Sequence, residues 1–109
     1  MRLCALAREI IMRDVITVIS ALAEPTRLEA IRILFGGGEH CVCELMSKLN
    51  ATQSRMSRHM GILKSSGLVV GRRDAQWVRY RLNPYLPPEI NAIVAAVTAV
   101  GPDRERKVA

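Results

Sequence analysis

Residues 40–63 read HCVCELMSKLNATQSRMSRHMGIL and contain two short helical patterns separated by a tight turn. The first pattern covers 42–49, just after Cys41, and its apolar residues recur at helical spacing. Asn50 and Ala51 form the turn. Thr52 is a suitable N-cap for the second pattern, which extends to about Ser65. Two short helices joined in this way are typical of a helix-turn-helix.

The flanking sequence predicts a winged form of this motif. Apolar residues alternate on either side of the polar segment 72–76, which indicates a β-hairpin over 68–82. Further helical patterns cover 3–22, 25–35 and 89–100. We therefore expect a single winged helix-turn-helix domain over residues 1–109, mainly α-helical with a β-hairpin wing. Its expected parts are dimerisation helices at 1–22 and 87–100, the helix-turn-helix at 42–65, the wing at 68–82 and a tail at 101–109.

A homodimer is expected because the first and last helices each carry an apolar stripe. These stripes are too long for a domain of this size to bury alone, and small domains often gain stability by dimerising. Isologous pairing would cover both stripes and place two recognition helices about one DNA turn apart, roughly 34 Å.

The net positive charge is confined to one part of the chain. The protein has 16 Lys and Arg against 10 Asp and Glu, a net charge of +6. Segment 54–81 holds seven of the bases and a single acid, Asp74, so it accounts for the whole excess. Such a footprint favours a polyanionic partner. Because only 4% of the residues are aromatic, stacking on single strands is disfavoured and duplex DNA is the expected partner.

The second helical pattern carries the expected DNA-reading residues on one face. Small side chains there would let the helix enter the major groove, where Arg58 could bond both acceptors of a guanine. The basic tip of the hairpin would meet the minor groove or the backbone. The candidate face comprises Ser54, Ser57, Arg58, Gly61 and Ser65, flanked by Gln53, Arg55 and His59. The candidate wing-tip contacts are Arg72, Arg73 and Gln76.

Several other protein classes are disfavoured. No apolar run approaches the length of a membrane span. Arg8 and Glu9 interrupt the N-terminal apolar segment, which makes it a poor signal peptide. We therefore expect a cytoplasmic protein with no membrane partner. No nucleophile-base pairing with an orienting acid and no phosphate-binding loop is evident, so neither an enzymatic activity nor a catalytic cofactor is expected.

Cys41 and Cys43 form a thiol pair at the start of the first helical pattern. In a reducing compartment, three cysteines favour free thiols or metal ligands over a disulfide framework. Thiolates select soft metals and metalloids, and a helix N-terminus favours the thiolate form. Residues two apart on an unbroken α-helix point to nearly opposite faces, so we expect the helix start to deform when both bind one ion. Cysteine is often buried, and a pair of small half-buried residues is the alternative interpretation.

The chain contains a specific combination of motifs: Leu22-Ala23-Glu24-Pro25-Thr26-Arg27-Leu28, Cys41-Val42-Cys43-Glu44-Leu45, Ser57-Arg58-His59-Met60, Ser66-Gly67-Leu68-Val69 and Trp77-Val78-Arg79-Tyr80-Arg81-Leu82. Together they resemble the ArsR/SmtB family of winged-helix metalloregulatory repressors, over about residues 14–86. Within that family, the Cys-Val-Cys motif resembles the arsenite-responsive branch. The resemblance implies a homodimer that binds a palindromic operator and is released when As(III) or Sb(III) binds its cysteine thiolates.

The third sulfur of such a site is left open by the sequence. At most three thiols are available, which suits a trigonal sulfur site better than a four-ligand site. Some relatives carry a third cysteine where this chain has Met46, which is expected to be a core residue. Cys4 could arrive from the partner chain or be incidental, and it would be absent if translation started at Met12. A repressor of the same fold that senses Cd(II), Pb(II) or thiol oxidation is the alternative function.

Overall fold

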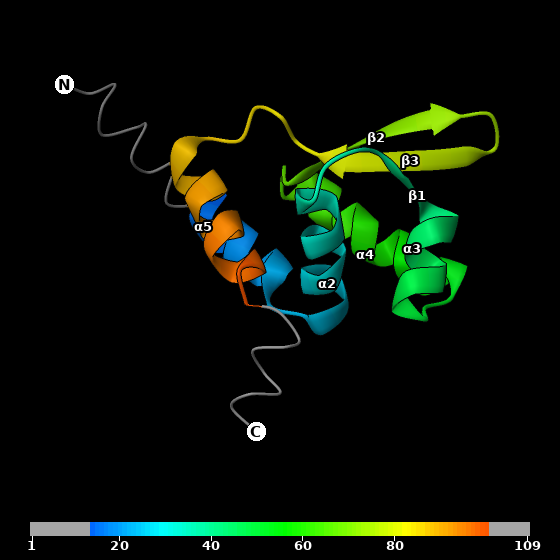
Figure 1. Ribbon diagram of the computed structural model, residues 1–109, viewed down its shortest axis with the longest axis horizontal. Helices are drawn as coiled ribbons and strands as arrows, with labels where there is room; N and C mark the ends of the chain where they lie inside the picture. Colours follow the sequence, from blue (N-terminus) through cyan, green and yellow to red (C-terminus); the bar gives the residue numbers. More distant parts are fainter. Residues whose placement is uncertain (1–13, 101–109) are drawn as a thin grey trace.

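The computed structural model describes residues 14–100, in which the helices lie to one side of a small antiparallel sheet whose hairpin projects from the molecule (Figure 1). Residues 14–22 are helical and lead into α2 (Pro25–Phe35). The chain continues through β1 (His40–Cys41), α3 (Val42–Leu49), α4 (Gln53–Ser65), β2 (Val69–Asp74), β3 (Trp77–Leu82) and α5 (Pro88–Thr98). The expected winged helix-turn-helix is confirmed. The predictions for residues 1–13, including Cys4, and for the tail 101–109 lie outside the described residues.

Local side-chain chemistry sets the boundaries of the helices around the turn. The carboxylate of Glu24 caps α2 by accepting a 2.9 Å hydrogen bond from the backbone N–H of Arg27. Thr52 caps α4 in the same way, since its hydroxyl accepts a 3.3 Å hydrogen bond from the N–H of Arg55, and this confirms the predicted cap. Asn50 ends α3 in the left-handed conformation with φ 52°, which asparagine adopts more readily than most residues. Asn50 and Thr52 together fix the short turn between α3 and α4.

A three-stranded antiparallel sheet in the order β1-β3-β2 forms the wing and joins it to the helices. β2 and β3 form the predicted hairpin, which pairs Asp74 with Trp77 next to its turn. β1 was not predicted, because a strand of two residues shows no alternation in the sequence. The β1–β3 register pairs His40 with Tyr80 and Cys41 with Arg79. The segment that precedes α3 is therefore tied directly to one strand of the wing.

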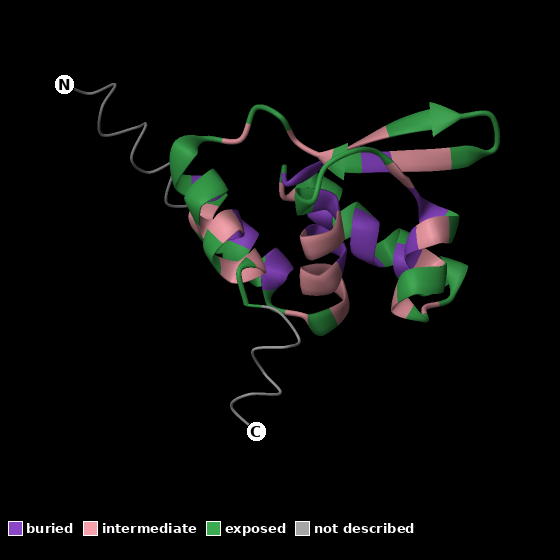
Figure 2. Ribbon diagram, viewed as in Figure 1, coloured by how far each residue is buried: buried purple, intermediate pink, exposed green. Residues whose placement is uncertain are grey.

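The core lies where α2, α3 and α4 meet, and buried residues mark the inner face of each (Figure 2). The apolar rows predicted on α3 and α4 supply Leu45, Met56, Met60 and Leu63, all fully buried. Burying apolar side chains of this size stabilises a fold by about 1.5–3 kcal/mol each. This burial fixes the rotation of α4 about its axis, so its polar face is held toward solvent.

The two expected dimerisation helices differ in how they use their apolar residues. The stripe on α5 packs largely within the protomer, where its residues are buried or partly buried: Ile90, Ile93, Val94 and Val97. Val100, at the end of the predicted helix 89–100, is 41% exposed, so the protomer covers this stripe only in part. On the helix over 14–22, by contrast, Ile16 is 63% exposed and Ile19 is 52% exposed. None of the helices in the described range is both long and apolar enough to cross a bilayer.

Candidate nucleic-acid interface and thiol site

The first two turns of α4 present polar side chains to solvent on the side away from the core. Met56 and Met60 fix this orientation because both are fully buried. The predicted contacts Gln53, Ser54, Arg55, Ser57 and Arg58 are all exposed. Within the part of the chain that the structure describes, neither Arg55 nor Arg58 forms an ion pair. Both guanidinium groups are therefore free to approach phosphates or base edges.

The last turns of α4 face the helix over 14–22 instead of an open surface. A groove of about 720 Å³ is lined by residues of both helices, among them Ile16, Arg58, Gly61, Ile62 and Ser65. Gly61 and Ser65 are exposed, as expected, but they border this groove. The candidate DNA-reading surface is thereby narrowed to the N-terminal half of α4, with Arg58 at its inner edge.

His59 lies on the inner side of α4, and this removes it from the candidate DNA contacts. The residue is only 9% exposed. Its Nδ1 atom lies 3.2 Å from Nη1 of Arg27 and 3.7 Å from the carboxylate of Glu24. Helical spacing could have revealed this position, because His59 follows Met56 by three residues and adjoins Met60, both of them in the predicted buried row.

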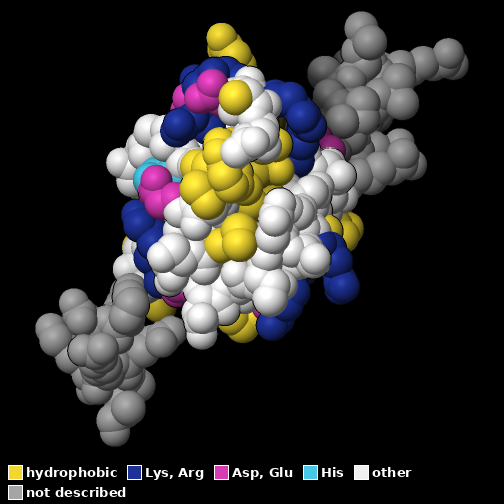
Figure 3. Space-filling view, turned by 90° about the vertical axis from the view of Figure 1, so that its right-hand side faces the viewer, with side chains coloured by type: hydrophobic (Ala, Val, Ile, Leu, Met, Phe, Trp, Pro, Cys, Tyr) yellow, Lys and Arg dark blue, Asp and Glu magenta, His cyan; other side chains and the backbone are white. Residues whose placement is uncertain are grey.

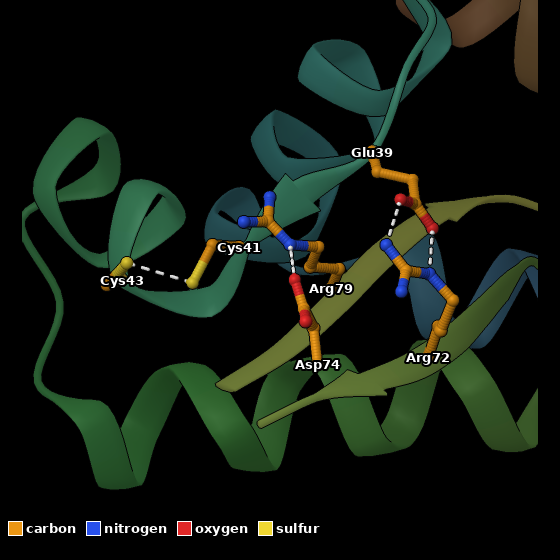
Figure 4. Close-up of polar contacts among 6 residues, drawn as sticks. All are labelled: Glu39, Cys41, Cys43, Arg72, Asp74 and Arg79. Atoms are coloured by element: carbon orange, nitrogen blue, oxygen red, sulfur yellow. Dashed lines mark hydrogen bonds and ion pairs between the residues drawn. The ribbon is translucent and has the colours of Figure 1, made fainter. Parts of the chain in front are cut away.

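Arg72 and Arg79 on the wing are both held by acids of the same protomer (Figure 4). Arg72, predicted at the wing tip, lies within β2 and donates two hydrogen bonds of 3.0 and 2.7 Å to the carboxylate of Glu39. These bonds hold the pKa of Glu39 below its usual value, so the carboxylate stays charged. Arg79 donates from Nε to Asp74 across 2.8 Å. The predicted wing contacts that stay exposed without such a bond are Arg73 and Gln76.

The sulfur atoms of Cys41 and Cys43 meet at the start of α3. Sγ of Cys43 donates a hydrogen bond to Sγ of Cys41 across 2.9 Å (Figure 4). The expectation that the helix start must deform to bring them together is wrong, because Cys41 is not helical. It ends β1 and forms the N-cap of α3, with φ −69° and ψ 148°. Only Cys43 lies in the first turn, so helical spacing does not separate the two thiols.

The two thiols have pKa values shifted in opposite directions. Burial raises the pKa of Cys41, but hydrogen bonds from the Cys43 thiol and from the N–H groups of Cys43 and Glu44 outweigh burial. The charge of Arg79 adds to them, so the pKa of Cys41 is lowered. The pKa of Cys43 is raised, chiefly by its hydrogen bond to Cys41. The pair therefore favours a thiolate on Cys41, the form that binds soft ions, with the proton on Cys43.

The thiol pair lies at the end of the molecule that carries α3 and the wing. In the space-filling view of this end, hydrophobic side chains, a class that includes cysteine, gather near the centre, with Lys and Arg side chains around them (Figure 3). Cys43 is exposed, whereas Cys41 is buried. The pair is therefore open to solvent through Cys43.

Other candidate ligands beside the pair have different environments. His40 is half-buried in β1, and its Nδ1 contacts the carboxylate of Glu44. Met46 is partly buried against the core, as predicted. Between residues 14 and 100, no three His, Cys, Asp or Glu side chains form a cluster that could hold a metal ion. The two thiols thus supply two soft ligands, and the third ligand stays a prediction.

The fold and the exposed basic face of α4 define a DNA-binding regulator of the winged helix-turn-helix class. The family model described as "Bacterial regulatory protein, arsR family" matches residues 24–70. The chain is 44% identical over 77 residues to the arsenic resistance transcriptional regulator ArsR2 of Pseudomonas putida, covering 71% of this chain and 67% of that protein. It is 42% identical over 72 residues to the arsenical resistance operon repressor of Escherichia coli, covering 66% of this chain and 62% of the repressor.

A solved structure supports the same class. The homodimeric winged helix-turn-helix domain Mb0332 of Mycobacterium bovis, described as a possible ArsR-family regulator, matches with a TM-score of 0.69 at 26% identity. The match covers 84% of this chain and 82% of that domain. The chain therefore belongs to the ArsR family of bacterial regulatory proteins. It is a transcriptional repressor of that family, and the expectation that it is not an enzyme is confirmed.

Proposed function

We propose that this repressor binds a palindromic operator as a homodimer and leaves the DNA when As(III) or Sb(III) binds the thiolates of Cys41 and Cys43. The observation that carries the proposal is the 2.9 Å separation of the two Sγ atoms at the start of the helix-turn-helix. Soft thiolates select thiophilic ions. The two relatives described above are named as arsenic or arsenical resistance regulators, which supports an arsenical inducer.

Binding of arsenous acid is a ligand exchange that leaves arsenic trivalent. At each cysteine an As–S bond forms and an As–O bond breaks. The departing hydroxide leaves as water, with the proton of the thiol where the sulfur is protonated and with a proton from solvent where it is a thiolate. Cys41 is expected to react first, because its pKa is lowered and that of Cys43 is raised, so Cys41 ionises more readily. The third position on arsenic is filled by the partner subunit's Cys4, by a small thiol or by hydroxide.

The position of the pair gives the ligand a short route to the DNA-reading surface. α3 and α4 are separated only by residues 50–52 and pack against each other, and Leu45 of α3 and Met56 of α4 are both fully buried in the core. A ligand at the start of α3 therefore acts on the element against which α4 is packed. It releases DNA only if it binds the DNA-free conformation more tightly than the bound one.

The homodimer in this proposal rests on the helix over 14–22. Ile16 and Ile19 are exposed there, and Mb0332, which shares the fold, is described as homodimeric. Light scattering at micromolar concentration should give the mass of a dimer, and a monomeric mass would remove the basis for a palindromic operator. A cytoplasmic location and the absence of a membrane partner complete the proposal.

Fluorescence anisotropy with a labelled operator duplex tests the proposed function. A phosphine should replace thiol reductants, because small thiols compete for arsenite. Arsenite should release the wild type, whereas C41S and C43S should bind the duplex normally and stay bound. C4S is the matched control: an unchanged response would mean that Cys4 is not the third ligand. Release of the C41S/C43S double variant by arsenite would refute the site.

The same assay separates the two alternative inducers. Cd(II) or Pb(II) in place of arsenite tests whether the pair senses divalent soft metals. Diamide without metalloid tests whether oxidation of the thiols releases DNA. Release by diamide alone, reversed by the phosphine, would favour a redox repressor over a metalloid sensor.

A further inference from the structure

The thiol pair has two connections to the rest of the domain. β1, which ends at Cys41, pairs with β3 of the wing, and α3, which contains Cys43, packs against the recognition helix α4. Cys41 belongs to β1 and lies opposite Arg79 of β3 in the antiparallel register. Arg79 donates from Nε to the carboxylate of Asp74, the last residue of β2. Figure 4 shows the Arg79 side chain beside Cys41 and directed toward Asp74. The Arg79 side chain therefore links the strand position opposite Cys41 to the end of β2 at the hairpin turn.

A second ion pair fixes β1 to the wing from its other end. Glu39, immediately before β1, accepts both hydrogen bonds from Arg72 of β2. Arg72 and Arg79 are direct cross-strand partners in the β2–β3 ladder. A displacement of the β1 segment therefore acts directly on the Glu39–Arg72 pair. It acts on the Arg79–Asp74 pair, which joins β3 to β2, only through the backbone pairing of Cys41 with Arg79.

The connection before β1 offers little resistance to such a displacement. Gly37 and Gly38 have φ of 101° and 81°, and a Cβ atom on either would meet nothing within 4 Å. The space beside both Cα atoms is therefore open, and the backbone of Gly37 is held by Leu34 and by the ring of His40. A shift of Cys41 is therefore absorbed easily on the α2 side, and on the other side it is passed to β3, which holds β1 by hydrogen bonds.

We propose that Arg79 is a positioning residue for the response, which carries ligand binding at Cys41 and Cys43 to the wing tip through its bond to Asp74. When the hydrogen bond between the two sulfurs is replaced by bonds from both sulfurs to one arsenic atom, the backbone at Cys41 adjusts and Arg79 moves with its strand partner. The wing tip then leaves the position in which Arg73 and Gln76 meet DNA. This inference rests on the proposed function, because the route through Arg79 operates only if a metalloid binds Cys41 and Cys43.

Trp77 provides a direct reporter for this route. It is the only tryptophan in the chain, it lies opposite Asp74 next to the hairpin turn, and it is 40% exposed. Its emission therefore reports the wing tip in the DNA-free protein without any label. Arsenite titrated into the wild type should shift this emission, and C41S should abolish the shift.

The variants R79Q and D74A test the route, and R81Q is the matched control. Arg81 loses the same charge from the same strand, but forms no ion pair with Asp74. For each variant, the affinity for operator is compared without arsenite and with saturating arsenite. The wild-type ratio is expected in the roughly 5–150-fold range that is usual for allosteric coupling, and R79Q and D74A should lower it about threefold or more. R81Q should keep both the ratio and the Trp77 shift.

The outcomes distinguish this inference from the proposed function. If arsenite neither binds nor releases the wild type, the proposed function fails and this inference with it. If arsenite releases the wild type while Trp77 emission stays constant, or if R79Q and D74A respond like R81Q, only the route through Arg79 is overturned. Direct titration of arsenite into R79Q shows whether the ligand still binds, so a lost response is not mistaken for a lost site.

Discussion

Nδ1 of His59 lies 3.2 Å from Nη1 of Arg27, and this contact fastens the recognition helix to the start of α2. Arg27 also donates from Nε to the backbone carbonyl of Ala21 across 2.6 Å, at the end of the preceding helix. A single guanidinium thus joins three helices beneath the candidate DNA-reading surface.

Replacing His59 with leucine should destabilise the fold. The substitution leaves Nη1 of Arg27 without its partner in a half-buried position, and such a loss costs about 1–3 kcal/mol. Urea unfolding followed by circular dichroism should show a lower midpoint with an unchanged slope. His59→Gln offers an acceptor in a similar place and should lose less. Equal midpoints for wild type and both variants would show that the contact contributes nothing.

Arg58→Ala should relax sequence preference at a cost of about 1–3 kcal/mol for the specific site. Arg58 is exposed on α4 and has no ion-pair partner among residues 14–100. Arg73→Ala is the comparison: it should weaken binding to all duplexes and reduce the salt slope by about 0.9. The measurement is anisotropy with operator and scrambled duplexes at several salt concentrations. An unchanged ratio between the two duplexes in Arg58→Ala would mean that α4 is wrongly oriented on DNA.

Glu39→Gln should strengthen binding to all duplexes. The Glu39 carboxylate accepts two hydrogen bonds from Arg72 and neutralises its charge in the free protein. Glutamine removes that charge, so the guanidinium becomes available to phosphate and the salt dependence should become steeper. Arg72→Ala should by the same reasoning cost less affinity than Arg73→Ala. A salt slope in Glu39→Gln equal to that of the wild type would contradict this account.

Glu24 should make the stability of the protein sensitive to acid. Burial raises the pKa of Glu24. Hydrogen bonds from the N–H groups of Arg27 and Thr26, together with the nearby His59, lower it by more, so the folded-state pKa lies below the ordinary 4.5. A carboxyl with a lowered pKa stabilises the folded state above its unfolded pKa, and this contribution is lost as pH falls through the folded pKa. Unfolding free energies measured from pH 6 down to pH 3 should fall less steeply in Glu24→Gln. Parallel curves would show that the cap does not titrate in this way.

The winged helix-turn-helix could be predicted from the sequence because its determinants are local. The apolar rows of 42–49 and 53–65 are visible as helical spacing, and Thr52 and Asn50 act within a few residues of their own positions. The hairpin is visible as alternation on both sides of a polar turn. The exposure of Arg58 and Arg73 follows from the same periodicities, and the structure places both as predicted.

The remaining features depend on pairing between distant segments. β1 exists only because β3 lies beside it, and its extended backbone is what keeps Cys41 out of the helix and within reach of Cys43. Glu39 and Arg72 are 33 residues apart in sequence, and Arg27 and His59 are 32 apart. No local pattern marks these partners, so the sequence could point to the two thiols but not to their geometry.

The two thiols come from residues only two apart, and this has a consequence for how the metalloid affects melting. An unfolded chain still holds Cys41 and Cys43 as neighbours and offers nearly the same two sulfurs. A ligand that binds both states stabilises the folded one by less than its affinity alone would give. Arsenite should therefore raise the melting temperature little, even at concentrations that empty the operator. The metalloid would then control whether the protein is bound to its operator, with little effect on its thermal stability.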